Sequence, residues 1–266
     1  MTDAIQLTGV SKTYRPPRKK PYLAITDIDL AVPSGRFVSV VGPSGCGKST
    51  LLSLVSGLLP PSSGTVALNG MPVLNVRTDV GFIFQRDALL PWKTVVENVR
   101  LPLEFRGVAG GEMRQRAIEW IARVGLAKFG DNYPHELSGG MRKRAQLAQV
   151  MVGDPAVLLM DEPFSALDVQ TRNLMENELL NVWGAAGKTV LFITHDLEEA
   201  IALSDEIVVM TAGPGRIKAR YSVNLPRPRN VTEVRFHPEF VALYERAWVD
   251  LRDEVTRSYE QSLRAS

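Results

Sequence analysis

The chain has 266 residues, 45% of them hydrophobic and 23% charged, which is typical of a soluble protein that can bury a substantial core. A formal net charge of +2 gives little electrostatic reason to expect general nucleic-acid binding. Because neither a signal-peptide pattern over Met1–Val10 nor an uninterrupted run of about 18 apolar residues occurs, we expect a chain that does not span a membrane by itself.

Two strands are predicted near the start of the chain, over Ile5–Leu7 and Ala24–Val32, because apolar and polar residues alternate there. Tyr14 precedes the loop between them, where its ring could stack on a nucleobase or pack locally. Four basic residues in this loop are interrupted by prolines: Arg15, Arg18, Lys19 and Lys20. The interruptions favour a solvated loop over a nucleic-acid-binding patch.

The apolar run Phe37–Val41 leads into GPSGCGKST at residues 42–50, which fits the phosphate-binding pattern G-x-x-x-x-G-K-[ST]. A strand, a glycine-rich turn and a helix N-terminus would point backbone N–H groups at one spot, which suits a polyphosphate. Lys48 would hold the β- and γ-phosphates, and the Ser49 hydroxyl would ligate magnesium. The residues of this phosphate loop are Gly42, Pro43, Ser44, Gly45, Cys46, Gly47, Lys48, Ser49 and Thr50. Cys46 is the only cysteine, which suits a reducing compartment.

Helical spacing replaces the strand pattern in the middle of the chain. Short strands are predicted over Gly64–Asn69 and Val80–Phe84, and the second is followed by Gln85. From residue 94 to about residue 151 the apolar residues recur at helical spacing, so a helical insertion is predicted after the first strand-rich lobe.

A Ser-Gly-Gly motif lies inside this insertion. Ser138, Gly139 and Gly140 precede a predicted helix over Met141–Val150. The motif would form an anion site at the helix N-terminus, although helix capping alone explains the same residues.

Two carboxylates follow a buried strand. The continuous apolar run Ala156–Met160 is typical of a strand covered on both faces of a parallel sheet, and it ends at Asp161 and Glu162. The carboxyl ends of such strands are where open α/β sheets bind ligands. Asp161 could accept magnesium-bound water and Glu162 could deprotonate an attacking water, whereas an acidic turn without a role is the alternative. The loop Ser165–Asp168 and a helix come next.

His195 follows the predicted buried strand Thr189–Thr194. A lone histidine is usually structural or solvated, but this one would leave the sheet at the same edge as Asp161, so it could reach a γ-phosphate. His135 and His237 have no such setting.

The strands are predicted to end with Glu206–Met210, and Gly213-Pro214-Gly215 marks a boundary. We therefore predict one domain over residues 1–215, with a helical subdomain over about 86–153, and a C-terminal extension over 216–266. An amphipathic helix is predicted over Pro238–Tyr259, which would dock on the same chain or on a partner.

The order of these motifs over residues 5 to about 215 resembles the ATP-binding subunit of an ABC transporter. The residues that carry the resemblance are Tyr14, the loop Gly42–Thr50, Gln85, the signature Leu137–Gly140, the pair Asp161 and Glu162, the loop Ser165–Asp168, and His195. The resemblance implies an α/β P-loop NTPase fold with a RecA-like core, an antiparallel β subdomain and an inserted α-helical subdomain.

The resemblance also implies ATP and Mg²⁺ as cofactors and a role for each site residue. The residues of hydrolysis would be Glu162 as general base, His195 at the γ-phosphate, Gln85 and Lys48. The residues that arrange magnesium would be Ser49, Gln85 and Asp161. The residues that hold the nucleotide would be Tyr14 at the adenine, the phosphate loop and Asp168. The signature residues Ser138, Gly139 and Gly140 would serve a head-to-tail dimer, with Ser138 and Gly140 contacting the γ-phosphate of ATP bound to the other subunit.

Finer features are similar to the importers of nitrate, sulfonates and taurine: Leu89–Trp92, Leu101–Gly107, Thr211–Ile217 and Leu225–Arg229. Met141 departs from the Gln that many relatives carry, and we expect it to tune the interface. The resemblance implies a homodimer that forms on ATP binding. Its partners would be transmembrane permease subunits and, indirectly, a solute-binding protein, but not nucleic acid. The chain would lie peripherally on the cytoplasmic face of the membrane. A soluble ABC-type ATPase acting on nucleic acid or ribosomes, or an exporter subunit, is the alternative.

Overall fold

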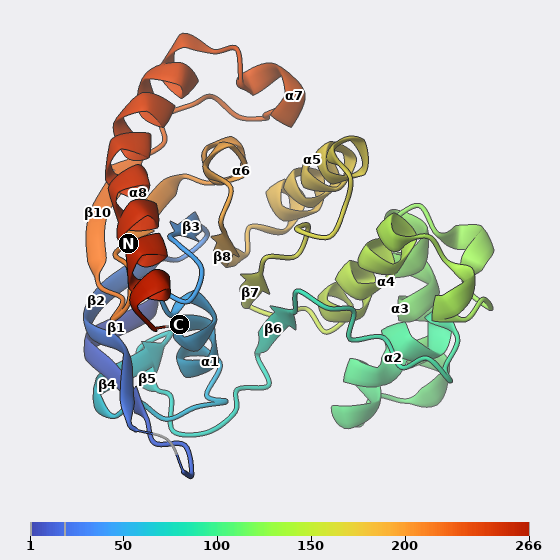
Figure 1. Ribbon diagram of the computed structural model, residues 1–266. Helices are drawn as coiled ribbons and strands as arrows, with labels where there is room; N and C mark the ends of the chain where they lie inside the picture. Colours follow the sequence, from blue (N-terminus) through green and yellow to red (C-terminus); the bar gives the residue numbers. More distant parts are fainter. Residues whose placement is uncertain (1, 19, 266) are drawn as a thin grey trace.

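The computed structural model describes residues 2–18 and 20–265, so the predicted loop position of Lys19 lies outside the described residues. Two sheets organise these residues (Figure 1). The six-stranded sheet has the spatial order β10 (Ile217–Ser222), β9 (Glu206–Met210), β3 (Phe37–Val41), β8 (Thr189–Thr194), β7 (Val157–Asp161) and β6 (Val80–Ile83). The four-stranded sheet has the order β2 (Tyr22–Pro33), β1 (Asp3–Tyr14), β4 (Ser63–Leu68) and β5 (Met71–Pro72).

The helices of the described residues pack around these sheets. They are α1 (Lys48–Val55), α2 (Val95–Phe105), α3 (Gly110–Arg123), α4 (Gly139–Met151), α5 (Val169–Ala186), α6 (Leu197–Leu203), α7 (Val231–Val234) and α8 (Pro238–Ala265), with short 3-10 turns at Ala127–Phe129 and Pro134–Glu136. In Figure 1, α2, α3 and α4 form a separate lobe next to β6, and α8 runs along the opposite side of the molecule.

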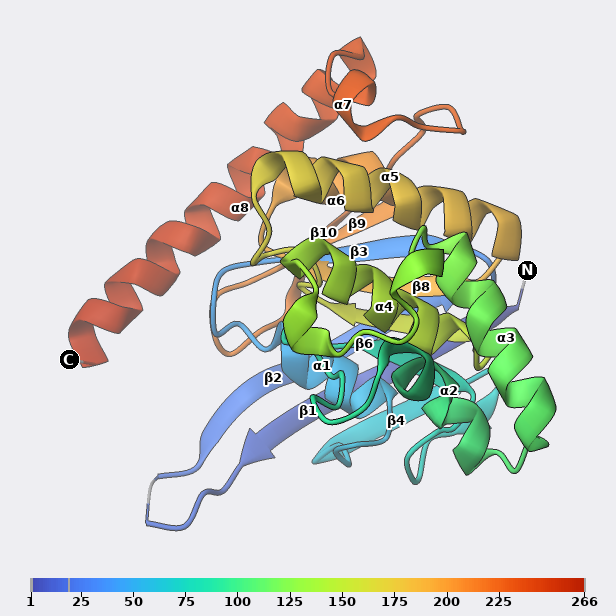
Figure 2. The ribbon, with the colours of Figure 1, turned by 90° about the vertical axis from the view of Figure 1, so that its right-hand side faces the viewer.

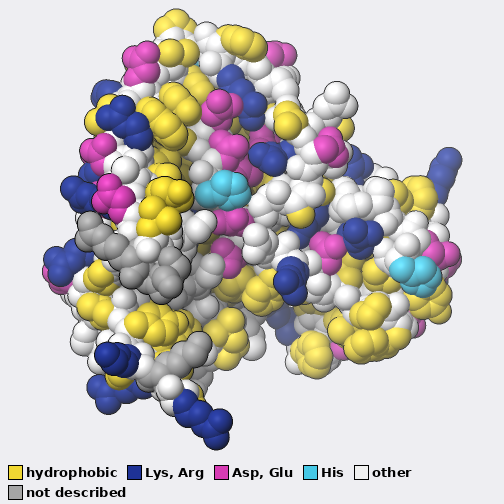
Figure 3. Space-filling model, in the orientation of Figure 1, with side chains coloured by type: hydrophobic (Ala, Val, Ile, Leu, Met, Phe, Trp, Pro, Cys, Tyr) yellow, Lys and Arg dark blue, Asp and Glu magenta, His cyan; other side chains and the backbone are white. Residues whose placement is uncertain are grey.

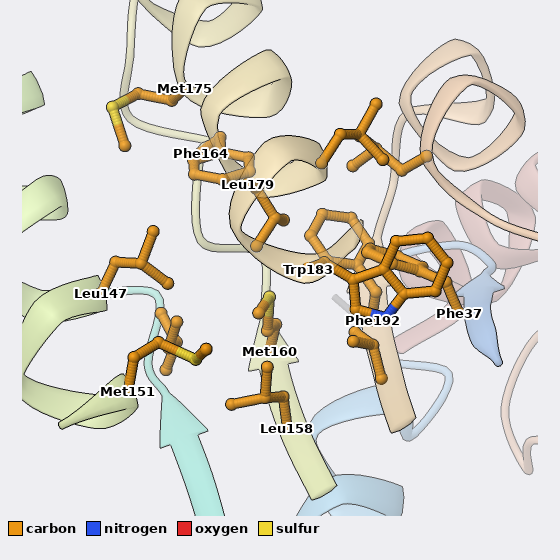
Figure 4. Packing of buried hydrophobic residues seen from close by; sticks show 14 of the residues in the cluster. Phe37, Leu147, Met151, Leu158, Met160, Phe164, Met175, Leu179, Trp183 and Phe192 are labelled. Atoms are coloured by element: carbon orange, nitrogen blue, oxygen red, sulfur yellow. The ribbon is translucent and has the colours of Figure 1, made fainter. Parts of the chain in front are cut away.

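The central strands are buried on both faces because successive side chains of a strand point to opposite sides. On β3, Phe37 and Val41 belong to one core, and Val38 and Val40 belong to the other. The first core lies under α5, α6 and the helical lobe, and Figure 4 shows Trp183 of α5 beside Phe37 and Phe192. The ring of Trp183 meets Phe37 edge-on, with the centroids 5.6 Å apart. The second core lies between the central sheet, α1 and the four-stranded sheet.

The helical subdomain is inserted between β6 and β7, which confirms the predicted change from strands to helices. A capping box starts α2: the Thr94 N–H donates to Glu97 at 2.8 Å, and the Glu97 N–H donates to the Thr94 hydroxyl at 3.3 Å. Gly125 ends α3 with φ at 72°, a backbone conformation that glycine adopts without a side-chain clash.

The prediction that Glu206–Met210 is the last strand was wrong. β10 (Ile217–Ser222) adds an antiparallel edge strand, with Ile217 paired to Met210. Lys218 and Arg220 make this strand polar, which suits a sheet edge. For the same reason the strand lacks the apolar run by which the other strands were predicted. The domain boundary after residue 215 remains a prediction, and the sheet continues across it. The predicted C-terminal helix exists, and it extends beyond residue 259 to Ala265.

Candidate nucleotide-binding site

The phosphate loop, Gln85, Asp161 and His195 lie near one another because parallel strands end at one edge of the central sheet (Figures 1 and 2). β3 ends at the phosphate loop, β6 precedes Gln85, β7 ends at Asp161, and β8 precedes His195. β3, β8, β7 and β6 are parallel neighbours in that order. Their carboxyl ends therefore bring together residues that are more than 140 positions apart in the chain.

The phosphate loop turns sharply before α1. Gly47 has φ at 100°, and a Cβ at this position would lie 2.3 Å from Cγ2 of Ile25. No side chain in the described part of the chain caps α1, so the N–H groups of its first turn are not covered by a cap. Lys48 is buried, and its Nζ donates to the carbonyls of Gly42 at 2.8 Å and Pro43 at 3.0 Å. Among residues 2–18 and 20–265 no carboxylate forms an ion pair with Lys48, so this cation and the loop fit an anionic phosphate group.

Ser49 and Asp161 form a small oxygen-rich cluster. The Ser49 hydroxyl donates to Oδ1 of Asp161 at 3.1 Å, and burial raises the pKa of the Asp161 carboxyl. Gln85 is not joined to this pair, since its Nε2 donates to the Ser165 hydroxyl at 3.3 Å. No group of three or more His, Cys, Asp or Glu side chains in the described residues could hold a metal ion. Mg²⁺ often takes only one or two carboxylates together with phosphate oxygens, so Asp161 and Ser49 fit this ion when a nucleotide is present.

Glu162 and His195 form a second pair. Nδ1 of His195 lies 2.9 Å from Oε2 of Glu162. Glu162 has φ at 43°, a left-handed conformation that is uncommon for a non-glycine residue and that recurs at functional sites. Both side chains line a cavity of about 650 Å³ together with Gln85, Ser165 and the signature residue Gly139. A carboxylate held by a histidine at the wall of a cavity can orient a water molecule and accept its proton.

Tyr14 lies beside the phosphate loop, because its hydroxyl is 3.2 Å from the Thr50 hydroxyl. Its ring stacks on Tyr22, with the centroids 5.2 Å apart and the planes 18° apart. The ring therefore packs locally and is also near the site, and stacking on adenine stays a prediction. Sequence reasoning missed Tyr22, which follows the intervening loop and pairs with Tyr14 across β1 and β2.

The signature lies on the helical subdomain, away from the phosphate loop. Ser138 caps α4 by accepting the N–H of Met141 at 3.3 Å. A Cβ at Gly140 would lie 2.8 Å from Cγ2 of Thr171, and Asp168 caps α5 by accepting the Thr171 N–H at 3.0 Å. This hydrogen bond lowers the pKa of Asp168. Figure 1 places α1 and α4 on opposite sides of β7. Gly139 lines the cavity at Glu162 and His195, whereas no residue of the phosphate loop lines that cavity.

Residues 25–165 match the ABC transporter family. The chain belongs to that family. It is 46% identical over 235 residues to an uncharacterized ABC transporter ATP-binding protein of Methanocaldococcus jannaschii, covering 88% of this chain and 86% of the relative. It is 42% identical over 226 residues to a taurine import ATP-binding protein, TauB, of Yersinia pestis, covering 84% of this chain and 89% of TauB.

The solved structures agree with the family. A dimeric, post-hydrolysis structure of the ATP-binding cassette MJ0796 with ADP and Pi is similar with a TM-score of 0.73 and 31% identity, over 84% of this chain and 100% of that chain. These comparisons confirm the predicted ABC ATPase fold and the predicted class of enzyme, an ATP hydrolase coupled to transport. Within the described residues, no helix combines the length and the apolar character that crossing a membrane needs.

In this ABC ATPase, α4 is tied to the segment that follows Gln85. Nζ of Lys143 is buried and donates to the carbonyl of Gln85 at 2.8 Å, and burial lowers its pKa. Asp87 accepts from Lys143 at 3.3 Å and from Arg142 at 2.9 Å. The pattern of the sequence did not predict this cluster, because the three residues look like ordinary surface charges until β6 and α4 pack together.

The loop before α2 is also fixed. Asn98 is fully buried, and its side chain bonds both the N–H and the carbonyl of Leu90, at 2.7 and 3.1 Å, and the carbonyls of Lys93 and Thr94. Trp92 is held at the surface by this loop with 70% of its area exposed. The ring of Trp92 is therefore not buried within the described part of this chain.

Proposed function

We propose that this chain hydrolyses ATP to power the import of a small solute through a membrane permease, with a small anion such as nitrate, a sulfonate or taurine as the cargo. One observation carries the catalytic part: Lys48, the Ser49–Asp161 pair and the Glu162–His195 pair lie together at the carboxyl ends of parallel strands, at one sheet edge. The similarity to a taurine import protein supports the direction of transport and the class of cargo.

ATP with Mg²⁺ supplies, when bound, the phosphoanhydride bond and the charge neutralisation that the reaction needs. The phosphate loop and Lys48 bind the phosphates, and Tyr14 stacks on the adenine. Ser49 and Asp161 would hold the metal, and Gln85 would join them on releasing its bond to Ser165. Glu162 accepts the proton of the attacking water, and His195, held by its 2.9 Å bond to Glu162, contacts the γ-phosphate.

Two copies complete the site. Each chain has one phosphate loop and one signature, and the two lie on different lobes, so Ser138, Gly139 and Gly140 act on the nucleotide of a second copy, next to Asp168. A nucleotide touched by both copies stabilises the closed dimer, and its hydrolysis removes that stabilisation. The dimeric structure of MJ0796 supports this arrangement.

The exposed surface of the helical subdomain supports a permease as the partner. A groove of about 360 Å³ separates β6 from α2, and its walls include Phe84, Pro102 and Phe105. Phe105 is 88% exposed. Apolar side chains beside a groove mark an interaction site. A permease that fills this groove would hold the chain on the cytoplasmic face of the membrane, and the solute-binding protein would act from the other side.

Dimerisation measured by light scattering tests the catalytic cycle. Glu162→Gln should bind ATP and form a stable dimer while turnover falls by roughly a hundredfold or more, the usual size of a general-base contribution. Ser138→Arg should bind ATP as a monomer and form no dimer, because an arginine at the N-terminus of α4 fills the space for the phosphate. Near-normal hydrolysis by Glu162→Gln would remove Glu162 from the role of general base. An ATP-driven dimer of Ser138→Arg would refute the shared site. Purification with nucleic acid instead of a polytopic membrane protein would refute the transport role.

A further inference from the structure

The long C-terminal helix α8 (Pro238–Ala265) has no part in the site proposed above. At 28 residues it is about 42 Å long, since an α-helix rises 1.5 Å per residue. One side of it is anchored: Phe240, Leu243, Ala247 and Leu251 are buried in the core that also covers α6. These residues recur at intervals of three and four, so they lie on one face of the helix.

The second half of α8 contacts the segment after β9 and, through Ser258, the phosphate loop. The buried Glu254 accepts the N–H of Ala212 at 2.9 Å, and the Gln261 amide donates to the carbonyl of Gly213 at 3.3 Å. The hydroxyl of Ser258 donates to the carbonyl of Ser44, within the phosphate loop, at 3.5 Å. The helix therefore ends beside the place where ATP is proposed to bind.

A second side of α8 is apolar and exposed. Val241, Trp248, Val255 and Tyr259 are spaced by seven, seven and four residues, which places them along one stripe, and Tyr259 is 65% exposed. We call these four residues the outer stripe. Figure 2 shows the last turns of α8 extending beyond the body of the molecule, and Figure 3 shows hydrophobic side chains along α8. An apolar stripe on a projecting helix is a surface suited to a partner.

We infer that the outer stripe is a dimer contact that packs on the helical subdomain of a second copy when ATP closes the pair. The inference rests on the proposed function. In that function the signature of the second copy covers the phosphate loop, so the subdomain that carries the signature lies beside Ser258 and Tyr259. The matching surface is aromatic: Phe129 and Tyr133, shortly before the signature, are both exposed. The contact thus continues the shared site outward along α8.

This chain is longer than the part of it that matches the dimeric cassette MJ0796. All of that dimeric cassette is matched by 84% of this chain, which leaves about a sixth of the chain outside the match. The ATP-bound pair of this protein should therefore be held by the shared nucleotide and, in addition, by the outer stripe.

Light scattering with ATP tests the contact, with Glu162→Gln as the reference dimer. In that background, Val255→Ser combined with Tyr259→Ser should weaken dimerisation about tenfold or more, the usual effect of truncating apolar anchors at an interface. The affinity of the monomer for a fluorescent ATP analogue should stay the same, because neither residue touches the phosphate loop. Val249→Ser is the matched control, since Val249 is exposed on a different side of α8 and should leave dimerisation unchanged.

A photocrosslink identifies the occupant of the stripe. With Tyr259→p-benzoylphenylalanine in a mixture of isotope-labelled and unlabelled protein, ATP should produce crosslinks between copies that end near Phe129 and Tyr133. Equal dimerisation of the stripe variant and the reference would refute the contact and leave the proposed function intact, as would crosslinks only within one copy. Failure of the reference itself to dimerise with ATP would remove the proposed cycle and the contact together.

Discussion

Two buried acidic residues between α5 and α6 should make the stability of the protein depend on pH. Glu176 is fully buried and Glu199 is 5% exposed. Burial, with a smaller contribution from the charge of Asp196, raises the pKa of Glu176 to about 7. Burial, with smaller contributions from the charges of Glu176 and Asp196, raises the pKa of Glu199 to about 8. Arg235, 3.8 Å from Glu176, and Arg172 oppose the rise.

A shared proton explains how the pair is accommodated. In the described part of the chain neither oxygen of Glu176 accepts a hydrogen bond from an N–H or hydroxyl group, and the Glu199 carboxyl lies within hydrogen-bond reach. A protonated Glu199 supplies the missing donor. The folded protein therefore holds protons that the unfolded chain, with an ordinary glutamate pKa of 4.5, releases.

The sign of the effect follows from this difference. The stabilisation by these carboxyls is fully present below pH 4.5 and is lost as the pH rises through their folded pKa values of about 7 and 8. Each carboxyl contributes a slope of about 1.4 kcal/mol per pH unit, so between pH 5.5 and 7.5 one of them removes roughly 2 kcal/mol.

Glu199→Gln tests this account. The glutamine amide keeps the size of the side chain and can donate an N–H to Glu176 at any pH. Because the amide does not titrate, the variant has one titrating carboxyl fewer. Urea unfolding followed by circular dichroism should show the variant gaining about 2 kcal/mol relative to the wild type between pH 5.5 and 7.5. Glu119→Gln, at an exposed position of α3, should follow the wild type at every pH. A difference between Glu199→Gln and the wild type that stays constant over this range would refute the reasoning.

Two further predictions concern the phosphate loop and the groove. Gly47→Ala places a Cβ 2.3 Å from Ile25 at a left-handed φ. We expect ATP affinity, measured by fluorescent-nucleotide titration, to fall about tenfold or more, and the free energy of unfolding to fall by about 1–3 kcal/mol. Gly9→Ala is the control, since its backbone is also left-handed but no atom crowds the new Cβ, and it should leave ATP binding unchanged. Phe105→Ser should leave the ATPase activity of the isolated chain unchanged but reduce recovery of the permease in affinity purification about tenfold or more. Ile118→Ser, at an exposed position of α3, should leave that recovery unchanged. Equal recovery with the two variants would argue against the groove as the docking site.

The central strands were predictable because they are buried on both faces. Thr189–Thr194 and Glu206–Met210 have the predicted bounds, since continuous apolar runs that end in polar residues leave little freedom in placing a strand. The phosphate loop was equally clear, because Gly47 and Lys48 occur at a spacing that a backbone cradle for phosphate requires. Parallel pairing then placed Glu162 and His195 together, as expected.

Features that depend on tertiary packing were not predictable. β10 escaped notice because an exposed edge strand needs no apolar alternation. Glu176 and Glu199 have the spacing of ordinary helix residues, and only the packing of α5 on α6 removes them from water. The stacking of Tyr14 on Tyr22 likewise depends on how β1 pairs with β2.

The bond from Lys143 to the carbonyl of Gln85 has a mechanical consequence. Because the same ammonium group also meets Asp87, the signature helix and the strand-end segment after β6 form one rigid lever. Because Gln85 also donates to the Ser165 hydroxyl, a movement of α4 would be passed through this segment to the loop after β7. The signature helix and the loop after β7 would then move together rather than separately.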